Sequence, residues 1–158
     1  MSKIRIEGGK LLTGTINISG AKNSAVALIP AAILCDEETT ILNVPNISDV
    51  DSLEEILRCL KAKINRESNS VKIDSSKIEN TIIPEELSKK LRASYYFMGS
   101  LLGKFKKVEM YFPGGCSIGE RPIDLHLQRF QKLGATITQE RNYIKIEAKE
   151  LIGSKIYL

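Results

Sequence analysis

The sequence contains no tryptophan, one histidine and three cysteines in 158 residues. Cys35, Cys59 and Cys116 form no CxxC pair, and His126 alone cannot complete a zinc site with them. Reduced thiols and the absence of a structural metal are therefore expected. Cys35 and Cys59, at helix ends or on helix faces, are predicted to be small core residues.

Long hydrophobic runs are also missing. No window approaches the roughly 18 uncharged apolar residues that a membrane-spanning helix needs, and the start, MSKIRIEGGK, has no apolar signal region. The net charge of +4 comes from lysines scattered among acidic residues, which does not favour nucleic acid. Composition and length predict about one soluble domain, placed in the cytoplasm, with no membrane or nucleic-acid partner.

An internal repeat is the main organising feature. Residues 59–74, CLKAKINRESNSVKID, align without a gap on residues 132–147, KLGATITQERNYIKIE, with seven identities in sixteen positions. A duplication with an offset of 73 residues explains this match. Each copy ends in two short alternating segments around a polar turn, which predicts a β-hairpin.

The same frame predicts the elements before each hairpin. An apolar helix over 23–34 and the strand ETTILNV precede a helix after Ser48, with Ser48 as N-cap and Asp51 at the capping-box position. In the second copy, one helix from Pro84 to Gly103 and the strand KVEMYF precede a helix after Arg121, which Gly134 ends. GTINI and SKIYL are expected to be further strands. The predicted fold class is α/β: mixed α+β units of helix, strand, helix, hairpin and strand, repeated about twice.

Three segments carry residues suited to anionic ligands. SGAKNS places Lys22 and Asn23 at a helix start, where unpaired N–H groups attract phosphate or carboxylate. The motif taken alone favours the simpler alternative, a capped helix with an exposed lysine. Arg92 lies in the predicted apolar helix, so it needs an anionic or carbonyl partner, which structural pairing would also supply. The stretch PGGCSIGERPIDLHL puts Cys116 on a glycine-rich loop.

The cysteine loop allows two interpretations. A thiol becomes acidic and nucleophilic when positive charge stabilises its thiolate, and Arg121, Lys22 and the following helix start could supply that charge. A non-catalytic loop cysteine fits the residues equally well. The repeat frame puts His126 at the core-facing position of Leu53, so a packed histidine is expected, and Asp124 matches Asp51, which makes helix capping an alternative to ligand binding.

Four strings occur in the order in which they stand in a known family: ISGAKNSA, LRASYYFMGSLL, PGGCSIGERPIDLHL and QKLGATI. The chain resembles the UDP-N-acetylglucosamine 1-carboxyvinyltransferases, a family of enolpyruvyl transferases, over essentially its whole length. The resemblance implies an inside-out α/β prism of six similar units in two lobes. It also implies transfer of the enolpyruvyl group of phosphoenolpyruvate to the 3′-hydroxyl of UDP-N-acetylglucosamine with release of phosphate, and no metal or organic cofactor.

The resemblance assigns roles to the candidate residues. Lys22 and Asn23 would contact phosphoenolpyruvate, and Cys116 would be the general acid and the site of covalent adducts. The residues implied on the UDP-N-acetylglucosamine side are Arg92, Arg121, Pro122, Ile123, Asp124 and Leu125.

Complete members of the family are well over twice as long as this chain. The resemblance therefore implies that residues 1–20 would join the second lobe, and that residues 21–158 form an incomplete cysteine-loop lobe, with repeats at about 21–84 and 85–158. An incomplete prism predicts exposed apolar surface, self-association or pairing with a separate C-terminal half. A non-catalytic fragment and the related 3-phosphoshikimate enolpyruvyl transferase are the alternative interpretations.

Overall fold

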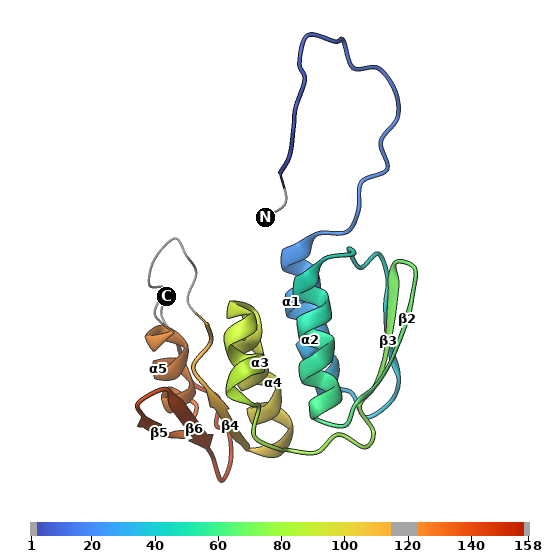
Figure 1. Ribbon diagram of the computed structural model, residues 1–158. Coiled ribbons are helices and arrows are strands. Elements are labelled where there is room, and N and C mark those ends of the chain that lie inside the picture. The colour runs from blue at the N-terminus through green and yellow to red at the C-terminus, as the bar shows by residue number, and fades with distance from the viewer. Residues whose placement is uncertain (1–2, 115–122, 157–158) are drawn as a thin grey trace.

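The computed structural model describes residues 3–114 and 123–156. Two helix-and-sheet units follow one another along the chain (Figure 1). The first contains the helix α1 (Lys22–Ala31), the 3-10 turn η1 (Ala32–Leu34), β1 (Thr39–Ile41), α2 (Ser48–Cys59), β2 (Lys63–Glu67) and β3 (Ser70–Asp74). The second contains α3 (Glu85–Lys90), the 3-10 turn η2 (Arg92–Tyr95), α4 (Tyr96–Phe105), β4 (Lys107–Tyr111), α5 (Asp124–Lys132), β5 (Thr136–Glu140) and β6 (Tyr143–Glu147).

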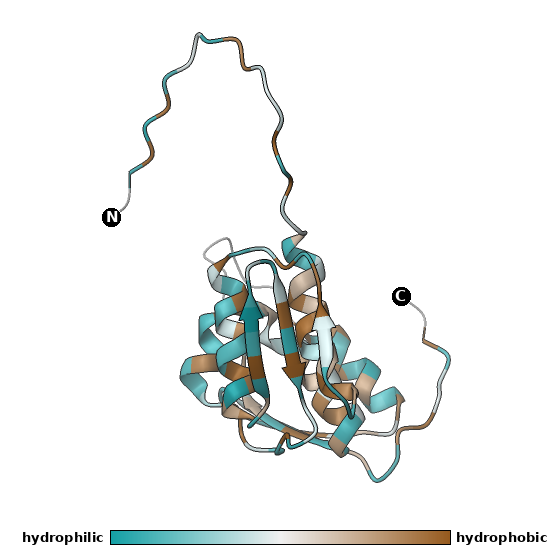
Figure 2. Cartoon of the chain, turned by 90° about the vertical axis from the view of Figure 1, so that its right-hand side faces the viewer, coloured by the Kyte–Doolittle hydropathy of each residue, from teal (hydrophilic) through white to brown (hydrophobic). Residues whose placement is uncertain are grey.

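The two sheets have the same topology, which confirms the predicted mixed α/β units. Both are antiparallel, with strand orders β1-β3-β2 and β4-β6-β5, and both predicted hairpins form. Ile64 pairs with Ile73 in the first hairpin, and Ile137 pairs with Ile146 in the second, at the predicted offset of 73 residues. Figure 2 shows apolar and polar residues alternating along the strands of the first sheet, as expected where one face is buried.

Backbone hydrogen bonds also repeat at this offset. Glu79 N–H donates to the carbonyl of Leu60, and Ile152 N–H donates to that of Leu133, at 2.8 and 2.9 Å. Gly134, with φ 94°, comes directly after Leu133, the C-cap of α5, as predicted for a residue just past the end of a helix. The repeat is therefore present in the backbone structure as well as in the sequence.

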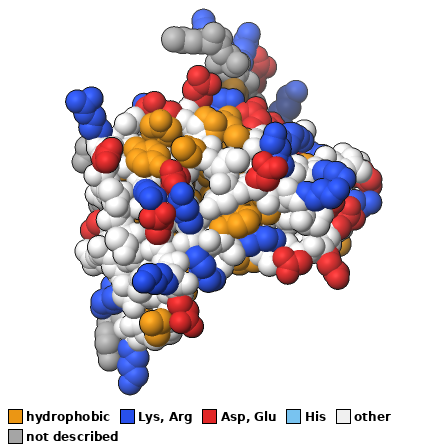
Figure 3. Space-filling model, turned by 90° about the horizontal axis from the view of Figure 1, so that it is seen from below, with side chains coloured by type: hydrophobic (Ala, Val, Ile, Leu, Met, Phe, Trp, Pro, Cys, Tyr) orange, Lys and Arg blue, Asp and Glu red, His pale blue; other side chains and the backbone are white. Residues whose placement is uncertain are grey.

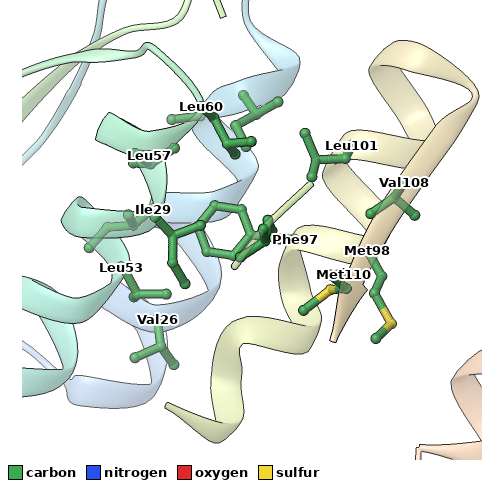
Figure 4. Packing of buried hydrophobic residues seen from close by; sticks show 14 of the residues in the cluster. Val26, Ile29, Leu53, Leu57, Leu60, Phe97, Met98, Leu101, Val108 and Met110 are labelled. Carbon is green, nitrogen blue, oxygen red and sulfur yellow. The ribbon is translucent and has the colours of Figure 1, made fainter. Parts of the chain in front are cut away.

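The core lies between the helices and the inner faces of the sheets. Figure 4 shows Phe97 of α4 pointing toward Ile29 of α1, with Leu53 and Leu57 of α2 close by. All four side chains are fully buried. Burying an aliphatic or aromatic side chain of this size contributes about 1.5–3 kcal/mol, so this cluster holds the two units together.

The prediction of a single helix from Pro84 to Gly103 is wrong. Leu91 is extended, with φ −137° and ψ 124°, and divides the segment into α3, η2 and α4. At this break the carbonyl of Ser88 accepts bonds from the Ser94 hydroxyl at 3.0 Å and from Gly114 N–H at 3.2 Å. Tertiary hydrogen bonds thus take the place of helical ones.

The predictions for the chain ends and the first helix cap are also corrected. Residues 14–18 and 154–156 form no strand, and no described strand pairs with them. Residues 3–19 extend away from the rest of the chain with exposed side chains (Figure 1). Ser48 is the first residue of α2 and not its N-cap, which is Ile47 without a side-chain bond. The membership of residues 1–20 in a second lobe stays a prediction.

Candidate active site

The N-terminal ends of α1, α2 and α5 lie at the same end of the molecule, the upper end in Figure 1. The chain also leaves β4 toward this end. Because helix N-termini carry unpaired N–H groups and partial positive charge, this end favours anions. The opposite end, seen from below in Figure 3, mixes acidic and basic side chains with separate hydrophobic patches.

Lys22 is the first residue of α1, and its ammonium forms an ion pair with the carboxylate of Asp49 in the first turn of α2. The lysine side chain is 56% exposed and the aspartate 21%. Asn23 is exposed beside it. The predicted phosphate-binding pair is therefore accessible, and a carboxylate that the sequence analysis did not single out holds the lysine.

A hollow of about 220 Å³ adjoins this helix start. Its lining includes Gly20, Ser24 and Asn43. A Cβ on Gly20 would lie 1.6 Å from the backbone oxygen of Asn43, so the chain approaches this point closely enough to require glycine. The glycine of the SGAKNS motif thus allows the close approach that sets where α1 begins.

Arg92 lies at the start of η2 and not inside a continuous helix, which corrects the sequence prediction. Its side chain is half-buried, and its guanidinium carbon lies 5.9 Å from the centre of the Tyr95 ring. Burial, then the hydrogen bond with Tyr96, raises the pKa of Tyr95 to about 12, so its phenol is neutral at physiological pH. Arg92 thus faces a neutral aromatic ring.

The predicted nucleotide segment is described only in part. Ile123 is buried and precedes α5, whereas Asp124 and Leu125, in the first turn of α5, are exposed. Cys116, Arg121 and Pro122 lie outside the described residues. Neither α2 nor α5 has a side-chain cap, and Asp51 binds Arg66 at 2.5 Å, so capping by Asp51 is wrong.

His126 and Cys35 differ from their predicted positions. His126 is exposed, with its ring centre 4.9 Å from that of Tyr95, while the next residue, Leu127, is buried in the core. The rotation of α5 about its own axis decides which of the two residues faces the core. The alignment of His126 with Leu53 does not define this rotation. Cys35 is exposed and Cys59 is half-buried, so the predicted core position is wrong for Cys35.

The sequence analysis missed Asp49 and Tyr95. An acidic residue in the first turn of a helix was the available signal for Asp49, but two candidates, Asp49 and Asp51, stand there. Tyr95 follows Arg92 by three residues, a spacing that brings side chains together on a helical turn. The Lys22–Asp49 and Tyr95–His126 contacts depend on a neighbouring element, which local patterns do not identify.

The part of the chain that the structure describes contains no cluster of three or more His, Cys, Asp or Glu side chains that could hold a metal ion. Over residues 3–114 and 123–156, no helix has the length and apolar character to cross a membrane.

The fold is the one seen in solved enolpyruvyl transferases. The chain superposes on the crystal structure of the enolpyruvyl transferase NikO from Streptomyces tendae with a TM-score of 0.78 and 22% identity, over 92% of this chain and 32% of that one. EPSP synthase from Acinetobacter baumannii gives a TM-score of 0.57 and 16% identity, over 90% and 35% of the two chains. At these identities the likeness concerns the fold.

The sequence identifies the family. Residues 6–158 match the EPSP synthase (3-phosphoshikimate 1-carboxyvinyltransferase) family, and the chain belongs to it. It is 51% identical over all its 158 residues to UDP-N-acetylglucosamine 1-carboxyvinyltransferase 2 of Oceanobacillus iheyensis, covering 37% of that protein. It is 46% identical to the protein of that name from Bacillus subtilis, again covering all of this chain and 37% of the relative. The chain thus spans little more than a third of the length of these relatives, and the resemblance seen in the sequence is confirmed.

Proposed function

We propose that this chain carries part of the active site of a UDP-N-acetylglucosamine 1-carboxyvinyltransferase. Such an enzyme transfers the enolpyruvyl group of phosphoenolpyruvate to the 3′-hydroxyl of UDP-N-acetylglucosamine and releases phosphate. The observation that carries the proposal is the 51% identity over the full chain to a relative of that name. We place this step of peptidoglycan synthesis in the cytoplasm.

Lys22 and Asn23 are proposed to contact phosphoenolpyruvate. The ion pair with Asp49 supports this role, since it holds the ammonium at the anion-favouring end of the molecule. Positive charge placed there before the reaction balances the charge that develops on the departing phosphate. Asp49 then acts as a positioning residue for Lys22.

Arg92 and the start of α5 are proposed to bind the uridine nucleotide. Arg92, at the start of η2, and Asp124 and Leu125, in the exposed first turn of α5, lie on elements joined through the Tyr95–His126 contact, which supports a shared role. The remaining residues proposed for this role are Arg121, Pro122 and Ile123.

Cys116 is proposed as the general acid. Its thiol would give a proton to the methylene carbon of phosphoenolpyruvate, while the sugar oxygen bonds to the neighbouring carbon, which protonation makes electrophilic. The thiolate can alternatively add to phosphoenolpyruvate or open the epoxide of fosfomycin. The support for this role is the sequence string PGGCSIGERPIDLHL.

Phosphate release is the deciding assay. The chain would be assayed with phosphoenolpyruvate and UDP-N-acetylglucosamine, alone and mixed with the remaining part of the O. iheyensis relative. We expect turnover only in the mixture, because the family's site lies between two lobes. Robust turnover by this chain alone would contradict the need for a second part, and no rescue would favour a non-catalytic fragment.

Two further measurements separate the alternatives. Replacing the nucleotide sugar with shikimate 3-phosphate tests the related transferase, which would then consume phosphoenolpyruvate. Mass spectrometry after fosfomycin treatment should locate the adduct on Cys116. The exposed Cys35 is an internal control, since equal labelling there would contradict an activated Cys116 thiol.

A further inference from the structure

The ring of Tyr95 contacts its own segment, η2, and also the distant helix α5. The Arg92 guanidinium carbon is 5.9 Å from the ring centre, and the His126 ring centre is 4.9 Å away at 55°. Tyr96 stacks on Tyr95 at 4.5 Å and 28°. The Tyr95 side chain therefore contacts Arg92, Tyr96 and the first turn of α5.

These contacts are more specific than general packing. A cation over an aromatic ring is attracted by the negative face of the ring, and a tilted ring pair brings the positive edge of one ring toward the face of the other. Phe97, two residues on, is fully buried among apolar side chains, whereas Tyr95 is half-buried and contacts a guanidinium and an exposed imidazole. A leucine would keep an apolar side chain here without making either contact.

We propose that Tyr95 is a positioning residue, which holds Arg92 against the start of α5 and so joins the two segments that bind the uridine nucleotide. This inference rests on the proposed function. It adds to that function a residue that touches no reacting atom. The Tyr95 ring sets the separation between Arg92 and the Asp124–Leu125 turn before the ligand arrives.

The ring contact can be tested without any ligand. His126 is the only histidine in the chain, so its imidazole NMR signals are assigned by composition alone. Tyr95→Leu should remove the ring-current shift of these signals, and Tyr95→Phe should retain it. Tyr111→Leu is the matched control, because Tyr111 contacts Tyr143 at 5.6 Å in the second sheet and not His126. Unchanged His126 signals in Tyr95→Leu would overturn the proposal.

The positioning role is tested by titration with UDP-N-acetylglucosamine. Tyr95→Leu should weaken binding about 5- to 30-fold, as expected for a loss of one or two aromatic contacts. Tyr95→Phe and Tyr111→Leu should stay within about twofold. Equal affinity of Tyr95→Leu and wild type, with the His126 shift lost, would overturn the role in binding.

Failure of the proposed function would look different. The wild-type chain would then show no response of its His126 signals to UDP-N-acetylglucosamine, alone or mixed with the remaining part of the relative. That result overturns the nucleotide role for both proposals. The ligand-free spectra would still decide whether Tyr95 joins η2 to α5.

Discussion

Lys22 and Asp49 form an ion pair that links the first residue of α1 to the first turn of α2. An anionic ligand that binds this ammonium would have to share its charge with the carboxylate. The carboxylate therefore has two opposing effects: it fixes Lys22 in place, and it competes with a phosphate for the same charge.

Asp49→Asn should strengthen binding of inorganic phosphate by about 2- to 5-fold at low salt. The reason is that an exposed ion pair contributes about 0.2–1 kcal/mol, which the phosphate no longer has to offset. Calorimetric titration at two salt concentrations measures this, and the gain should shrink at the higher one. Asp51→Asn is the control, since Asp51 pairs with Arg66. Weaker phosphate binding by Asp49→Asn alone would show that fixing Lys22 outweighs competition.

The two units differ where α2 and β2 meet. The buried Glu54 is 3.6 Å from Arg66, and these residues correspond at the offset of 73 to Leu127 and Gln139. Arg66→Gln should lower the free energy of unfolding by about 1–3 kcal/mol, because it leaves a buried carboxylate with fewer partners.

The double variant Glu54→Leu with Arg66→Gln copies the second unit. It should be less destabilised than the sum of the two single variants, and urea unfolding of all four proteins gives the coupling free energy. Strict additivity within about 0.3–0.5 kcal/mol would contradict a direct interaction.

Gly114 lies where β4 leads into the cysteine loop. A Cβ there would be 2.0 Å from the backbone oxygen of Lys89, so Gly114→Ala must move β4 away from α3. We expect a loss of about 1–3 kcal/mol in unfolding free energy, as for other overpacked sites. Gly153→Ala, where nothing lies within 4 Å of the added Cβ, should be nearly neutral in the same thermal or urea unfolding experiment. Equal effects of the two substitutions would refute the steric argument.

Glu109 makes stability depend on pH. Its hydrogen bonds to Lys107 and Tyr143 hold the pKa of its carboxyl below the ordinary value of 4.5. A lowered folded pKa contributes stability above the unfolded pKa, and this contribution is lost as the pH falls through the folded one. The difference in unfolding free energy between wild type and Glu109→Gln should therefore be constant above about pH 6 and shrink below pH 4.5.

Tyr143→Phe tests the cause of that shift. Without the phenol hydrogen bond, the pKa of Glu109 should move back toward its ordinary value, so the loss of stability on acidification should begin at a higher pH. An unchanged acid limb in both variants would show that this cluster contributes nothing to the pH dependence.

Local patterns were sufficient for much of the fold. Period-two alternation predicted both hairpins, and apolar spacing from Val50 to Leu60 predicted α2, because these signals depend on neighbours within a few residues. The same locality explains the errors. The break at Leu91 depends on bonds that Ser94 and Gly114 make to Ser88, and GTINI has the alternation of a strand without a described partner.

The candidate site likewise has one part that the sequence predicts and another that depends on tertiary contacts. Short sequence strings were enough to identify the family. Two of these strings, ISGAKNSA and LRASYYFMGSLL, contain Lys22 and Arg92, so the sequence also singled out these residues. Which distant side chains meet was settled by packing: Lys22 with Asp49, and Tyr95 with His126. The physical reason is that helix phase and helix-to-helix contact bring these residues together across long sequence separations, and short-range periodicity carries no information about either.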